Sequence, residues 1–82
     1  MKNLTNRQVS LAFTFLDRVA LDRDYRMLPM SARYDRALAL VRANIADPLI
    51  AGDIGVTDLV AITAYFLTKR DQMTAKEAAL QE

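Results

Sequence analysis

The chain has 82 residues, 52% of them hydrophobic, with two glycines and two prolines, a composition that excludes a disordered or fibrous protein. It contains no cysteine and no histidine, which excludes disulfides and the usual zinc or iron ligands. A chain of this length buries only about 60 to 65% of its unfolded surface, so helix packing and self-association must supply its stability. We expect one domain, residues 1–82, without a metal or other cofactor.

The net charge is only +1, but it is unevenly distributed. Up to Ala46 there are eight basic and four acidic side chains, whereas residues 47–68 hold three aspartates and no basic residue. Such an uneven charge distribution favours electrostatic steering toward a charged partner, or head-to-tail contact between copies of the chain.

The first residues lack the apolar segment of a secretory signal. Aspartates interrupt the apolar runs before they reach the roughly 20 residues that span a bilayer. We therefore expect a cytoplasmic protein that does not act at a membrane.

The first helix is predicted over residues 5–23. Thr5 and Gln8 have the spacing of a capping box, in which each side chain bonds the backbone N–H of the other residue. An apolar stripe follows at helical spacing, with Leu11 and Phe15 beside it. The stripe consists of Val9, Ala12, Phe13, Leu16, Val19 and Ala20.

Pro29 ends any continuation of that helix, and residues 24–30 form a connection with room for a short turn of its own. Ser31, or Pro29 as a first helical residue, opens a second helix over residues 31–46, which stops before Asp47 and Pro48. Leu40 lies on the flank of its stripe. The stripe consists of Tyr34, Ala37, Leu38, Val41 and Ile45.

A third helix is predicted over residues 58–72, after a bend at Gly52 and Gly55 and with Thr57 as its N-cap. Its large apolar side chains cover an arc of roughly 220°, more than two neighbouring helices can cover. They are Leu59, Val60, Ile62, Tyr65, Phe66 and Leu67. Thr74 to Glu77 match a second capping box, so either a short fourth helix begins there or the third continues to Glu82. The predicted fold is an all-α bundle of three main helices plus a short C-terminal helical segment.

Residues 50–62 have the pattern of the turn and second helix of a helix-turn-helix, with small Ala51 and a turn glycine at Gly55. However, Pro48 and Gly52 leave the first helix barely one turn long. The second helix carries Asp58 and no arginine, lysine, asparagine or glutamine before Lys69, so it lacks donors for base edges and phosphates. A capped core helix after a glycine turn is the better interpretation.

Arginines gather around the first connection, interleaved with aspartates. Three interpretations remain open: a solvated face with weak ion pairs, a phosphate-binding surface and a protein-facing patch. Asp22 has a favourable spacing to Arg26 if the helix persists there. The arginines are Arg18, Arg23, Arg26, Arg33, Arg36 and Arg42.

Catalytic and metal sites have little support. Asp22 and Asp24 have the spacing of the first two ligands of a calcium-binding loop. However, Arg33 occupies the twelfth position, where the loop needs a bidentate glutamate. Without histidine or cysteine there is no evident pairing of a base with a nucleophile. We expect no enzymatic activity.

Apolar side chains outside the predicted stripes either form a contact surface or are covered by the C-terminal segment, which would then fold back over them. We expect a small non-enzymatic protein that docks to a protein partner, as an adaptor, assembly component or inhibitor of bacterial or phage type, and that forms a homodimer. Met27 and Met30 offer adaptable contacts. The alternative is nucleic-acid binding by the arginine-rich N-terminal half. The candidate partner-binding residues are Leu11, Phe15, Arg18, Arg23, Arg26 and Arg33.

Overall fold

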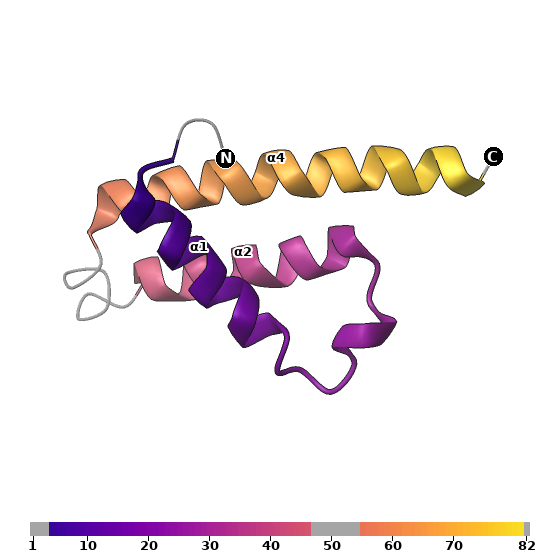
Figure 1. Ribbon diagram of the computed structural model, residues 1–82, viewed down its shortest axis with the longest axis horizontal. Coiled ribbons are helices and arrows are strands. Elements are labelled where there is room, and N and C mark those ends of the chain that lie inside the picture. Colours follow the sequence, from indigo (N-terminus) through magenta and orange to yellow (C-terminus); the bar gives the residue numbers. More distant parts are fainter. Residues whose placement is uncertain (1–3, 47–54, 82) are drawn as a thin grey trace.

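The computed structural model describes residues 4–46 and 55–81, which form three α-helices and one short 3₁₀ helix. These are α1 (Asn6–Val19), η1 (Tyr25–Met27), α2 (Met30–Ala46) and α4 (Val56–Gln81). The described residues contain no strand, so the predicted all-α bundle is confirmed. Figure 1 shows α2 running alongside the longest helix, α4, while α1 crosses the pair obliquely.

Two predicted features, the stop at Asp47 and Pro48 and the bend at Gly52, lie outside the described residues. Within the described ranges, no helix has the length and hydropathy to cross a membrane.

Helix α1 begins as the sequence predicts. The Thr5 hydroxyl accepts a hydrogen bond from the Gln8 N–H at 3.2 Å, and the Gln8 side chain accepts one from the Thr5 N–H at 3.1 Å. The helix ends at Val19, however, and not near Arg23. The N–H groups of Leu21 and Asp22 donate to carbonyls three residues back, which tightens the chain into a turn that leads to η1.

The buried face of α1 differs from the predicted stripe. Ala12, Phe15 and Val19 are buried together with Gln8, whereas Phe13 is 51% exposed. Positions 8, 12, 15 and 19 follow the four-and-three spacing of one helical face. The prediction that Phe13 is buried and Phe15 lies off the core is therefore wrong.

Helix α2 packs as predicted, with Ala37, Leu38 and Val41 fully buried. It begins at Met30, and the Pro29 carbonyl accepts the Arg33 N–H at 3.2 Å. Ser31 therefore lies inside the first turn and does not cap the helix. The side chain of Ile45 is outside the described part of the chain.

Helix α4 begins at Val56, two residues earlier than predicted. The Gly55 carbonyl accepts the Leu59 N–H at 3.2 Å, so Thr57 is within the first turn and not at the N-cap. Gly55 has a φ of 95°, a conformation that a residue with a Cβ adopts only with strain. The backbone conformation of Gly55 thus leads the chain into α4.

The separate C-terminal helix is not present. Helix α4 continues to Gln81, as the second of the two predicted alternatives has it. The predicted second capping box does not form. The Thr74 hydroxyl donates to the Arg70 carbonyl at 2.9 Å, and the Glu77 carboxylate binds Ser31 in α2. Residues 69–81 contain neither glycine nor proline, so nothing interrupts the helix there.

The core lies where α4 meets the other two helices. Leu59, Ile62 and Phe66 are fully buried, and Phe66 packs against the Tyr34 ring with centroids 6.1 Å apart. Of the predicted apolar arc on α4, only Val60 stays more than half exposed. Two neighbours therefore cover more of this helix than we predicted.

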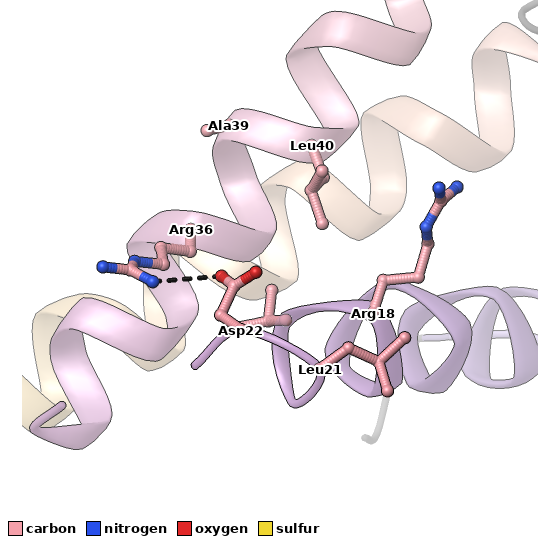
Figure 2. Close-up of a pocket in the computed structure, with 7 residues that line it drawn as sticks. Arg18, Leu21, Asp22, Arg36, Ala39 and Leu40 are labelled. Carbon is pink, nitrogen blue, oxygen red and sulfur yellow. Dashed lines mark hydrogen bonds and ion pairs between the residues drawn. The ribbon is translucent and has the colours of Figure 1, made fainter. Parts of the chain in front are cut away.

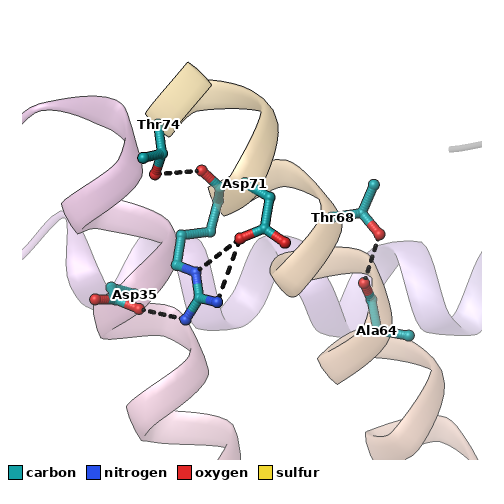
Figure 3. Close-up of polar contacts among 6 residues, drawn as sticks. Asp35, Ala64, Thr68, Asp71 and Thr74 are labelled. Atoms are coloured by element: carbon teal, nitrogen blue, oxygen red, sulfur yellow. Dashed lines mark hydrogen bonds and ion pairs between the residues drawn. The ribbon is translucent and has the colours of Figure 1, made fainter. Parts of the chain in front are cut away.

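Polar contacts at the surface also join α2 to α4. Arg70 on α4 reaches Asp35 on α2 at 3.1 Å and Asp71 on its own helix at 3.3 Å (Figure 3). These hydrogen bonds raise the pKa of Arg70. The contact with Asp35 helps to keep α2 alongside α4.

Candidate docking surface

Arg36 on α2 holds the connection between α1 and α2. Its guanidinium donates two hydrogen bonds of 2.7 Å to the Asp24 carboxylate and one of 3.0 Å to Asp22. The hydrogen bonds from Arg36 keep the pKa of Asp24 below its ordinary value, and the same contacts raise the pKa of Arg36. Asp22 therefore pairs with Arg36, and the helical pairing with Arg26 does not form because α1 ends before Asp22.

An open hollow of about 400 Å³ lies where the end of α1 faces α2. Figure 2 shows Arg18 and Arg36 on opposite sides of it, with Asp22 and Leu40 between them. We call it the α1–α2 hollow. It is lined by Arg18, Val19, Leu21, Asp22, Arg36, Ala39 and Leu40.

Three candidate arginines lie at or near this hollow on the surface. Arg18 lines it, and Arg23 and Arg26 belong to the connection that follows. All three side chains are exposed, and none forms an ion pair within residues 4–46 and 55–81. Their guanidinium groups are therefore accessible at the surface.

Arg33 is placed differently from the other candidate arginines. Its guanidinium lies over the Tyr25 ring, 4.2 Å from the ring centroid, and it also contacts the Met30 sulfur at 3.3 Å. Its Nε atom is buried without a hydrogen-bond partner in the described part of the protein. Arg33 thus packs the connection onto α2 and is only partly exposed.

The two apolar candidates are not free surface residues. Phe15 is only 4% exposed and belongs to the core, so the expectation that it offers a contact surface is wrong. Leu11 is half-buried and packs against the same core. The reason is the rotated buried face of α1, which turns both side chains inward.

The largest exposed apolar side chains near the arginines are Leu21 and Met27, at 83% and 84% exposure. Met27 was anticipated as an adaptable contact. Leu21 was missed, because the sequence predicts a helix through that position and nothing in it marks the earlier end at Val19. Together with Arg18, Arg23 and Arg26, these two side chains define what we call the docking surface.

The hollow is lined by both apolar and ionisable side chains. Its ionisable groups are Arg18, Arg36 and Asp22, of which the last two are paired with each other. Nowhere in the described ranges do three acidic side chains gather closely enough to hold a metal ion. The hollow can therefore contact an apolar group beside Arg18, which has no ion pair within the described residues.

Comparisons of the chain with models of protein families, with curated proteins and with solved structures found no match.

Proposed function

We propose that the protein is a non-enzymatic docking module that binds a protein partner through the docking surface and the adjoining α1–α2 hollow. The observation that supports this most directly is the exposure of Leu21 beside Arg18 at the hollow. Exposed apolar side chains next to arginine are typical of protein interfaces, in which arginine is enriched. An adaptor, an assembly component or an inhibitor would each use such a surface.

A protein partner fits this surface better than a nucleic acid. Asp22 and Asp24 stand among the arginines, and these carboxylates would repel a phosphate backbone. Leu21 and Met27 also offer apolar area that phosphates do not use. The first turn of α4 carries Asp58 and exposed Val56, which are poor groups for base edges.

Photocrosslinking in the native host tests the proposal. A photoreactive amino acid in place of Leu21 should give a discrete adduct with a protein, and Arg18→Glu should suppress it. Leu80 is the matched control position, because it is 87% exposed but lies near the end of α4, away from the docking surface. Adducts at both positions, or at neither, contradict the proposal. An adduct of twice the chain mass identifies the partner as a second copy, which is our proposed homodimer.

Nucleic-acid binding is the second candidate, since Arg18, Arg23 and Arg26 are exposed and without ion pairs in the described part of the chain. A mobility-shift assay with a salt titration separates the two. A phosphate binder loses affinity steeply as salt increases, whereas a protein-docking module ignores both DNA and RNA.

A further inference from the structure

An exposed leucine and an apolar hollow lie next to each other at the end of α1. Leu21 is 83% exposed, so most of its side chain has no contact with its own chain. Beside it, buried Val19 and half-buried Leu40 line the α1–α2 hollow. A volume of about 400 Å³ is at the lower end of the range of binding pockets, about 300 to 1,000 Å³, and accommodates a leucine side chain. One chain therefore carries both halves of an apolar contact.

The charges at the hollow are of both signs and lie apart. Arg36 binds Asp22 and Asp24 together, so two carboxylates share one guanidinium and the group keeps one net negative charge. Both carboxylates are about half exposed and thus accessible to a second cation. Across the hollow, Arg18 has no ion pair with any described residue (Figure 2). The four side chains together are neutral, with an unpaired positive charge on one side and a negative excess on the other.

A surface with these two properties is complementary to a second copy of itself. In a dimer with two-fold symmetry, each residue on one side of the axis faces residues from the other side of the axis in the second copy. An axis between Leu21 and the hollow can place each Leu21 in the hollow of the other copy. The same axis can bring each Arg18 toward the carboxylates that the other copy holds on Arg36. The net charge of +1 adds little repulsion between copies.

We infer that the occupant of the hollow is Leu21 of a second copy of the chain. The two copies exchange their Leu21 side chains, and Arg18 pairs with Asp22 and Asp24 across the interface. This inference rests on the proposed docking function and names the partner. Because few side chains take part, the dimer is weak, with a Kd on the order of 10 to 100 µM.

Light scattering over a range of concentrations measures the dimer on the full chain. The mass should rise from that of the 9.2 kDa monomer toward twice that value as the concentration passes the Kd. Leu21→Asp should stay monomeric at concentrations about tenfold higher, and it should fold because this side chain is exposed. Leu80→Asp is the matched control, since Leu80 is similarly exposed but lies near the end of α4. It should dimerise like the wild type.

Charge reversal tests the ionic part of the interface. Arg18→Glu should raise the Kd of the dimer about tenfold, because it turns a carboxylate toward Asp22 and Asp24 of the other copy. Arg42→Glu is the matched control, since Arg42 is an exposed arginine of α2 that does not line the hollow. It should leave the Kd unchanged.

Engineered disulfides locate the interface. The chain has no cysteine, so introduced thiols are the only ones present. A copy with Leu21→Cys and a copy with Ala39→Cys should form a mixed disulfide, because exposed Ala39 lines the hollow. Such a bond requires Cα atoms within about 7 Å of each other. Leu80→Cys with Ala39→Cys is the control pair and should give only the yield of random collisions.

Several outcomes overturn the inference: a wild-type mass that stays at that of the monomer up to about 1 mM, dimerisation that Leu21→Asp leaves intact, or equal yields of the two mixed disulfides. An unchanged Kd in Arg18→Glu contradicts the pairing of Arg18 across the interface. If no dimer forms but photocrosslinking at Leu21 captures another protein in an Arg18-dependent manner, only the identity of the partner is wrong. If crosslinking fails as well, the docking function is wrong.

Discussion

The carboxylate of Glu77, near the end of α4, accepts two hydrogen bonds from Ser31 in the first turn of α2, at 3.1 Å from the backbone N–H and 2.6 Å from the hydroxyl. The N–H groups of a first helical turn have no acceptor within their own helix, and a negative charge there interacts favourably with the helix dipole. A residue 46 positions away thus caps the N-terminus of α2. This contact gives the long extension of α4 a structural role.

Replacing Glu77 with alanine should lower the free energy of unfolding by about 1 to 2 kcal/mol, the usual effect of losing a helix cap. Hydrogen exchange should show the Ser31 amide losing its protection. Lys76→Ala is the control, because Lys76 is an exposed neighbour on the same helix. If Ser31 exchanges at the wild-type rate in Glu77→Ala, the cap contributes nothing in solution.

The two phenylalanines of α1 should respond differently to truncation. Phe15→Ala removes a ring from the core and should cost about 3 to 5 kcal/mol, enough to unfold much of a small domain. Phe13→Ala should cost well under that, because half of its ring is already in water. Urea denaturation of both variants provides the measurement. Equal losses would indicate that the buried face of α1 is not the one described.

Phe13 and Phe15 also show why the buried face of α1 was predicted incorrectly. The apolar pattern admits either Phe13 or Phe15 on the buried face, and the choice depends on the neighbouring helices. Gln8 lies on the true buried face, where its side chain bonds both Thr5 and Asp58. A pattern that assigns polar residues to solvent therefore selects the wrong stripe. The capping box at Thr5 and the described part of the α2 stripe were predicted correctly from local spacing, whereas the same spacing at Thr74 forms no capping box because Glu77 binds Ser31 of another helix.

The docking surface was only partly predictable for a related reason. The arginines at positions 18, 23 and 26 were recognised from composition, and they are exposed. The pairing of Arg36 with Asp22 and Asp24 joins residues 12 to 14 positions apart, and it depends on the early end of α1. No propensity in the sequence marks that end, so Leu21 and the hollow beside it were not expected.

The contact between Asp24 and Arg36 should make the connection sensitive to acid. Because the pKa of Asp24 is lowered in the folded state, the contact stabilises the fold fully above the ordinary aspartate pKa of about 3.9. That contribution is lost as the pH falls through the lowered pKa. Carboxyl NMR titration should show Asp24 titrating below the usual range, and Arg36→Gln should return its pKa to that range.

Arg42→Gln is the control for this titration, because Arg42 is an exposed arginine on the same helix that does not contact Asp24. It should leave the Asp24 titration unchanged. A normal Asp24 pKa in the unmodified protein would mean that Arg36 does not hold the connection.

Gln8 joins the start of α1 to the start of α4, and substitutions there separate its two roles. Its carbonyl oxygen accepts the Thr5 N–H at 3.1 Å, while its amide donates to the Asp58 carboxylate at 3.0 Å. Gln8→Glu keeps an acceptor for the capping box but turns a carboxylate toward Asp58. At neutral pH this variant should lose about 1 to 3 kcal/mol of stability, because the hydrogen-bond donor to Asp58 is replaced by a second negative charge.

The pH dependence of Gln8→Glu identifies the cause. Repulsion from Asp58 raises the pKa of the new carboxyl in the folded state, so the variant should be most stable relative to wild type in acid and lose that stability as the pH rises through the raised pKa. Urea denaturation from about pH 4 to about pH 7 measures the trend. Adding Asp58→Asn should remove most of the pH dependence, because the amide can donate to the new carboxylate. A pH-independent loss that persists with Asp58→Asn would instead assign the role of Gln8 to the capping box alone.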